Sequence, residues 1–205
     1  MAPTRRTASL SLALTVAALS AACAGGLVRA DVPAGPCFTA ARLGELRGAM
    51  TCDGDWLGGS SSSGGLAADL DLASRRGVEV VIDMRSASLR ASAPLAEPAA
   101  AAELEVIAVD LLEGVEASGG SESPAVRITD QAVDRIRAEL GNNGRPRVLL
   151  LDDDGRLATS VYAIHLVVDE GVDAATALRA ARSTGLTESC QAFVAAQVAR
   201  ILEGR

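Results

Sequence analysis

One stretch decides the fold: residues 148–157, which read Val-Leu-Leu-Leu-Asp-Asp-Asp-Gly-Arg-Leu. The four aliphatic residues at its start predict a strand that is buried on both faces. A polar turn containing Gly155 follows, and residues 158–168 then carry apolar side chains nearly all round, which is typical of a helix inside a core. A strand, a tight loop and a helix direct backbone N–H groups toward an anion, yet this loop carries three carboxylates.

The sequence on both sides of this stretch alternates helices and strands. Strands are predicted at residues 78–82 and 105–109, and helices at 66–76, 98–104, 130–140, 173–181 and 188–202. This alternation predicts an α/β fold with a small, mostly parallel sheet flanked by helices. Sites in such sheets lie at the carboxyl ends of the strands, which places residues 83–85, Asp110 and residues 152–156 along one edge.

The first 22 residues have the pattern of an export signal. Two arginines precede an apolar run over residues 10–22, and this run is too short for a comfortable membrane span. Residues 19–23, Leu-Ser-Ala-Ala-Cys, resemble a bacterial lipobox with Cys23 as the lipidated residue; simple secretion after ordinary cleavage is the alternative. We therefore expect a protein of the cell envelope or periplasm, whose contact with a membrane would be a lipid anchor on Cys23.

The rest of the chain divides by composition into a lead-in and a domain. Residues 23–65 have mixed composition and predict a partly ordered lead-in with a hairpin around residues 46–56. The lead-in ends in a Gly/Ser-rich run, residues 58–65, which is typical of a flexible linker. The predicted α/β domain follows over residues 66–205.

The composition excludes several classes of function. The chain has 205 residues and 49% hydrophobic content, enough for one core, and its net charge of −7 argues against a nucleic-acid partner. All 19 basic residues are arginines, which excludes lysine chemistry, and His165 is the single histidine, which excludes a histidine-rich metal site.

His165 and Cys190 are expected in the core, and Arg85 in a structural ion pair or hydrogen bonds. Cys37 and Cys52 are candidates for a short disulfide loop in an oxidising compartment.

The order of these elements over residues 66–186 resembles the dual-specificity and tyrosine phosphatase-like superfamily, in particular its bacterial group associated with β-lactamase-hydrolase-like proteins. Residues 77–85, Gly-Val-Glu-Val-Val-Ile-Asp-Met-Arg, resemble that group's Gly-x-x-x-Val-Ile-Asp/Asn-Leu-Arg segment. Residues 148–151 resemble the strand before its phosphate loop, and residues 158–168 and 171–182 resemble the helices that follow. The resemblance implies a three-layer architecture with its site at the loop.

The phosphate loop departs from that family. The family places a nucleophilic Cys at the end of this strand, and an Arg that holds two phosphate oxygens near the start of the helix. Here the nucleophile position is Asp152, and the Arg position falls on Leu157 or Ala158. Gly155 is kept, while Arg156 comes one or two places too early. The resemblance therefore implies a pseudophosphatase without a cofactor, which binds or scaffolds an unknown protein or small-molecule partner.

An alternative from another class is a metal-dependent enzyme. Residues 152–157 also resemble the first motif of haloacid dehalogenase-like phosphohydrolases, in which Asp152 would be the nucleophile, Asp154 the acid, and Mg²⁺ would offset their charge. That family needs a Lys, which this chain lacks.

Asp110 stands where phosphatases keep a general acid, or it is a turn residue. Without catalysis, Asp152, Asp153 and Asp154 form a solvated acidic turn or bind a divalent cation.

Overall fold

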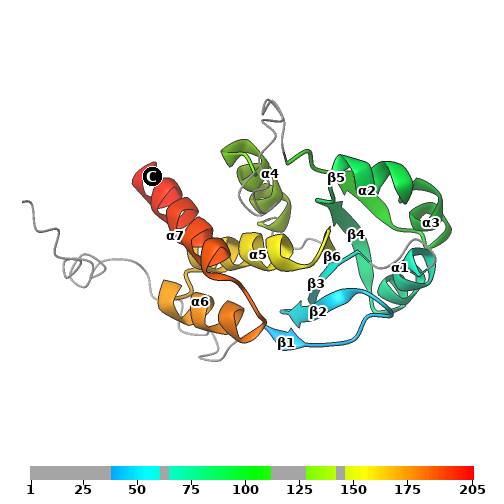
Figure 1. Ribbon diagram of the computed structural model, residues 1–205, viewed down its shortest axis with the longest axis horizontal. Helices are drawn as coiled ribbons and strands as arrows, with labels where there is room; N and C mark the ends of the chain where they lie inside the picture. Colours follow the sequence, from blue (N-terminus) through cyan, green and yellow to red (C-terminus); the bar gives the residue numbers. More distant parts are fainter. Residues whose placement is uncertain (1–37, 61–64, 112–127, 142–145) are drawn as a thin grey trace, which may run out of the picture. The chain divides into compact units, whose positions relative to one another are not determined.

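A six-stranded sheet runs through the described part of the computed structural model, residues 38–60, 65–111, 128–141 and 146–205 (Figure 1). The strands are β1 (Thr39–Ala40), β2 (Arg47–Cys52), β3 (Asp55–Gly59), β4 (Val78–Asp83), β5 (Glu105–Ala108) and β6 (Arg147–Asp152). Their order is β1-β2-β3-β6-β4-β5; β1 to β3 pair antiparallel, and the other neighbours pair parallel. The predicted α/β class with a mostly parallel sheet is confirmed.

Helices cover both faces of this sheet. Those in the described residues are α1 (Leu66–Arg75), α2 (Ala87–Ser92), α3 (Ala96–Ala101), α4 (Asp130–Leu140), α5 (Arg156–Val168), α6 (Ala174–Ser183) and α7 (Glu188–Glu203). In Figure 1, α1, α2 and α3 lie on one side of the strands, and α4 to α7 gather on the other side. The arrangement has three layers, as the predicted architecture requires.

The central strand β6 is buried on both faces because β3 and β4 flank it. Val148 and Leu150 belong to the apolar cluster that contains α4, α5 and α7. Leu149 and Leu151 belong to the opposite cluster, with α1 and α3. Each fully buried aliphatic side chain contributes about 1.5–3 kcal/mol. The four-residue aliphatic run therefore joins the two halves of the core, as the sequence predicts.

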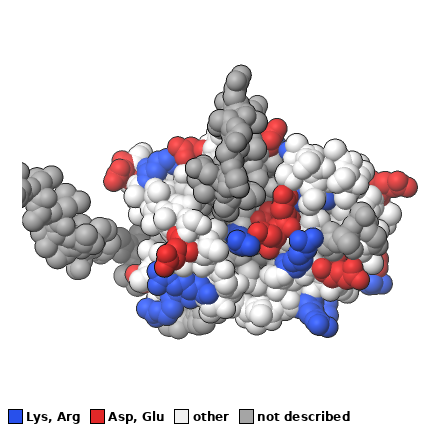
Figure 2. All heavy atoms as spheres, in the orientation of Figure 1, with Lys and Arg blue, Asp and Glu red and all other residues white. Residues whose placement is uncertain are grey.

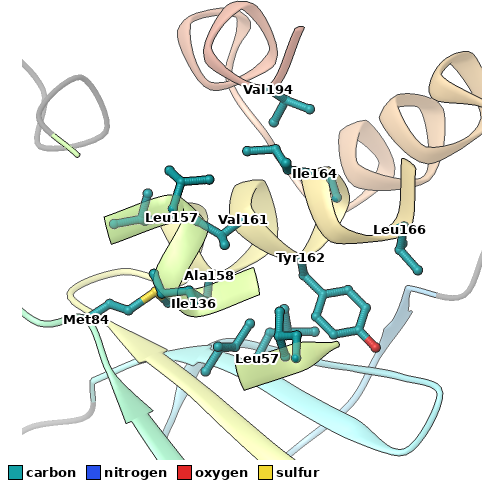
Figure 3. Packing of buried hydrophobic residues seen from close by; sticks show 14 of the residues in the cluster. Leu57, Met84, Ile136, Leu157, Ala158, Val161, Tyr162, Ile164, Leu166 and Val194 are labelled. Atoms are coloured by element: carbon teal, nitrogen blue, oxygen red, sulfur yellow. The ribbon is translucent and has the colours of Figure 1, made fainter. Parts of the chain in front are cut away.

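Helix α5 lies inside the larger cluster, and eleven of its 13 residues are buried. Figure 3 shows Ile164 beside Val194 of α7, while Leu157 and Ala158 lie near Met84 and Ile136. The helix is apolar nearly all round because it packs between the sheet and the outer helices.

His165 of α5 is buried, and its Nδ1 lies 3.0 Å from Oδ2 of Asp169. This contact lies at the C-terminal end of α5, where Asp169 follows the helix, on the side of the sheet that the outer helices cover. The prediction of a core histidine is confirmed. The side chain has a structural partner and lies at the opposite end of α5 from the loop after β6.

The folded part of the chain extends N-terminally of the predicted domain start at residue 66. The antiparallel β2–β3 pair confirms the predicted hairpin, and β3 also pairs with β6. The prediction of a flexible linker is wrong at Gly58 and Gly59, which are buried residues of β3. A Cβ on Gly59 would lie 2.5 Å from the carbonyl carbon of Asp154, so this glycine is required by a close approach of two backbones.

The predicted signal peptide, Cys23 and Cys37 lie outside the described residues. Cys52 is disulfide-bonded and Cys190 is a free, buried thiol. Because Cys37 is not among the described residues, its pairing with Cys52 stays a prediction. Within the described ranges, no helix combines the length and the apolar character needed to cross a membrane.

Candidate functional site

The carboxyl ends of four parallel strands meet along one edge of the sheet. Gly59 of β3 pairs in register with Asp152 of β6, and Asp83 of β4 pairs with both Leu151 and Ala108. The edge therefore brings together the ends of β4 and β6, as predicted from the sequence. Asp110 follows β5, which is two strands away from β6 and hence roughly 10 Å from it.

The side chain of Asp152 fills the loop that follows β6. Asp152 is 3% exposed, and the backbone N–H of Gly155 donates to its Oδ1. Its Oδ2 accepts from the N–H groups of Leu157 at 2.8 Å and Ala158 at 3.4 Å. The first N–H groups of a helix have no partner within the helix, and together they attract an anion. Here that anion is a carboxylate of the same chain.

The charge state of Asp152 is set by opposing effects. Burial raises the pKa of its carboxyl from the ordinary 3.8 to about 7, and the negative charge of Asp154 acts in the same direction. The three N–H donors lower this pKa, but they do not offset the loss of hydration. The carboxyl is therefore poised near neutral pH.

The other two aspartates of the loop also have partners in the protein. Asp153 Oδ1 accepts the backbone N–H of Ser86 at 2.8 Å, which ties the loop to the start of α2. Asp154 Oδ1 accepts the N–H of Arg156 at 3.0 Å, and its Oδ2 lies 3.1 Å from Arg156 Nε. The predicted solvated acidic turn is wrong for the buried Asp152 but describes the half-exposed Asp154 well. Figure 2 shows acidic and basic side chains next to one another on the face in view.

Arg85 is a buried cation near this edge, and its partners are structural. Its guanidinium is bidentate on Asp83, with Nε 2.8 Å from Oδ1 and Nη2 3.0 Å from Oδ2. Nη1 donates to the carbonyl oxygen of Ala93 at 2.9 Å, beyond the end of α2. The predicted structural ion pair is confirmed. The Asp83–Arg85 pair therefore fixes the segment between β4 and α2.

Comparisons with known proteins identify this architecture. The sequence matches no protein-family profile and no curated protein. The structure resembles a DUF442 protein from Shewanella putrefaciens CN-32, with a TM-score of 0.57 and 13% identity over 76% of this chain and 94% of that chain. It also resembles TpbA of P. aeruginosa in complex with pTyr, with a TM-score of 0.56 and 15% identity over 83% of this chain and 99% of that chain. The chain has the dual-specificity phosphatase-like fold.

A third similar structure is the human tyrosine phosphatase-like serine/threonine/tyrosine-interacting protein, with a TM-score of 0.52 and 13% identity over 73% of this chain and 93% of that chain. At these identities the likeness establishes the phosphatase-like fold alone. The chemistry of this chain must be argued from its own residues at the loop after β6.

The position where the phosphatase-like family carries its Arg belongs to the core here. Leu157 and Ala158 are 6% and 0% exposed, and both lie in the larger apolar cluster. A guanidinium at either position would have to enter that cluster or displace the first turn of α5. In this turn the basic residue is Arg156, which is half-exposed and paired with Asp154.

The structure gives the metal-dependent alternative no geometric support. Asp152 is turned into the loop, whereas Asp154 points outward to Arg156. In the part of the chain that the structure describes, no group of three or more His, Cys, Asp or Glu side chains is placed to hold a metal ion. Asp110 has a 62% exposed side chain that lies 3.4 Å from Arg90, which fits a turn residue better than a buried acid.

Three site residues were missed at the sequence level. Ser60 donates its N–H to the carbonyl oxygen of Asp152 at 2.8 Å, Ser86 binds Asp153, and Gly59 makes room for the loop. Their roles depend on backbone contacts between distant segments.

Replacing Gly155 with alanine should destabilise the fold by more than the same change at Gly171. Gly155 has a φ of +89°, and a Cβ there would lie 3.2 Å from both Arg47 O and Gly59 N. Left-handed strain costs about 1–3 kcal/mol, and the crowding adds to it. Gly171→Ala is the matched control, because its φ is +71° with nothing within 4 Å. Urea denaturation measures the free energy of unfolding of both variants. Equal losses for Gly155→Ala and Gly171→Ala would show that the close packing around the loop contributes nothing.

Proposed function

We propose that this chain is a pseudophosphatase: an exported protein of the phosphatase-like fold that binds a partner and does not turn over phosphate esters. One observation carries the proposal. The N–H groups that an incoming phosphate would need already hold the carboxylate of Asp152, at 2.8 Å from Leu157 and 3.4 Å from Ala158. The ligand is part of the chain, so an external phosphate must displace it before it can bind to the loop.

Electrostatics support the proposal. An ionised carboxylate at 4 Å opposes a second anion by about 4 kcal/mol at an effective dielectric of 20. Asp152 and Asp154 both act in this way, and Arg156 offsets part of the effect through its pair with Asp154. No cysteine stands in the loop, and its one arginine, Arg156, is already paired with Asp154.

The partner and the location are further parts of the proposal. The export pattern of residues 1–22 and the lipobox-like segment before Cys23 support a place in the cell envelope or periplasm, with a lipid anchor as one form of attachment. One structural neighbour is named a tyrosine phosphatase-like serine/threonine/tyrosine-interacting protein, and this name supports a binding role for the fold. For this chain we propose an unknown protein or small-molecule partner, and neither a nucleic acid nor a cofactor.

An aryl phosphate assay tests the proposal. The protein should release no more product than buffer, with or without Mg²⁺, and Asp152→Asn should not change this result. An active phosphatase of the same fold serves as the positive control. The control variant is Asp71→Asn, which alters an exposed ion pair on α1. Turnover that requires Mg²⁺, survives in Asp71→Asn and disappears in Asp152→Asn would establish the metal-dependent enzyme instead.

A further inference from the structure

The hydrogen-bond partners of the Asp152 carboxyl suit one of its two charge states. Among the described residues these partners are all N–H donors: Gly155 on Oδ1, and Leu157 and Ala158 on Oδ2. An ionised carboxylate accepts from all three. A protonated carboxyl carries an O–H, and a proton on Oδ2 would compete with the two N–H groups that this oxygen accepts. The hydrogen bonds seen in the structure therefore favour the ionised carboxylate over the protonated acid.

The surroundings of Asp152 nevertheless disfavour its charge. The residue is buried, and the charged groups near it have hydrogen-bond or ion-pair partners of their own. On the loop, Asp153 accepts from Ser86, and Asp154 is paired with Arg156 of α5. The end of β4 contributes the Asp83–Arg85 pair. On the other flank, β3 ends in Gly58 and Gly59 and is followed by Ser60, and none of the three carries a charge.

We infer that residues 152–157 form a proton-operated, two-state loop. With Asp152 ionised, its carboxylate holds the first turn of α5 in place. With Asp152 protonated, the hydrogen bonds from these N–H groups weaken and the loop rearranges. The change reaches two neighbouring segments, because the Asp152 carbonyl holds Ser60 at the end of β3 and the Asp153 carboxylate holds Ser86 at the start of α2.

This inference stands whether or not the protein is a pseudophosphatase, because it concerns the state of the loop alone. A pKa of about 7 for the Asp152 carboxyl supports it, since both states are then populated within the range of pH that cells and their envelopes experience. A partner that binds one state of the loop would therefore bind or dissociate as the pH of the surroundings falls.

The test follows the backbone amide resonances of Gly155, Leu157 and Ala158 by NMR between pH 5 and 9. We expect the three to shift together with one midpoint near the pKa of Asp152. Asparagine is neutral and has one acceptor, so Asp152→Asn at pH 8 should place these resonances where the wild type has them in acid. Asp154→Asn removes a neighbouring charge and should move the midpoint to lower pH. Asp71→Asn should leave it unchanged.

Two results would overturn the inference. One is a set of amide positions that stay constant across this pH range. The other is a titration that persists unaltered in Asp152→Asn, since another group would then be responsible. If Asp152→Asn does not fold, the side-chain carboxyl ¹³C resonance of Asp152 replaces it as readout. A carboxyl midpoint that does not coincide with the amide midpoint, or that stays fixed in Asp154→Asn, would then reject the two-state loop.

Discussion

Replacing Arg85 with methionine should destabilise the fold by roughly 3–5 kcal/mol, because the change leaves the Asp83 carboxylate buried without its counter-ion. The two side chains are 0% and 4% exposed, and two nitrogens of the guanidinium contact the carboxylate. Methionine also removes the hydrogen bond to the Ala93 carbonyl. Both losses act on the segment that joins β4 to α2, next to the loop after β6.

Urea denaturation with matched controls measures this loss. Arg75→Met breaks the Arg75–Asp71 pair, whose side chains are 66% and 56% exposed, and should cost at most about 1 kcal/mol. Combining Asp83→Leu with Arg85→Met removes both buried charges, so the double variant should recover a large part of the single variant's loss. A cost for Arg85→Met no greater than that of Arg75→Met would contradict the role given to the buried pair.

The stability of the protein should fall as the pH rises from about 4 to above 7, through the titration of Asp152. Its pKa is raised from 3.8 to about 7 in the folded state, so the folded protein holds a proton that the unfolded chain has released. The contribution of this group is fully present below pH 3.8 and is lost as the pH passes through about 7. A difference of this size corresponds to about 4 kcal/mol.

The free energy of unfolding of the wild type and of Asp152→Asn should be compared at several values of pH from 4.5 to 8.5. The wild-type advantage over the variant should shrink steadily with rising pH. The hydrogen bond from Arg200 lowers the pKa of the Asp134 carboxyl, so this group titrates at more acid pH. Carboxyls of this kind therefore do not contribute to the change expected over this pH range. If the difference in free energy of unfolding between the wild type and Asp152→Asn stays constant or grows with pH, the buried carboxyl is not destabilised in its charged form.

The main features of the fold could be predicted from the sequence where local pattern and tertiary packing agree. The aliphatic residues before Asp152 made β6 recognisable, and α4 begins at Asp130, where the sequence predicts a helix to start. Gly58 and Gly59 were misinterpreted as part of a linker. Their composition is typical of flexible segments, but what fixes Gly59 in β3 is the close approach of Asp154, a contact between residues far apart in the chain.

The site could be predicted in part. The sequence showed that negative charge stands where an oxyanion would bind. It did not show that Asp152 turns its carboxylate inward, while Asp154 turns outward to Arg156. That difference depends on which of the two carboxyls the sheet buries and on the three N–H groups that the turn at Gly155 and the start of α5 provide. Neither can be obtained from residue types alone.

The most direct test of the account is a crystal structure grown at pH 8 and soaked in sulfate, with the loop after β6 resolved. Asp152 is ionised at this pH, and the account predicts that its carboxylate accepts from the N–H groups of Gly155, Leu157 and Ala158, with no oxyanion in the loop. A sulfate held by those three groups, with the Asp152 side chain turned away, would contradict the account.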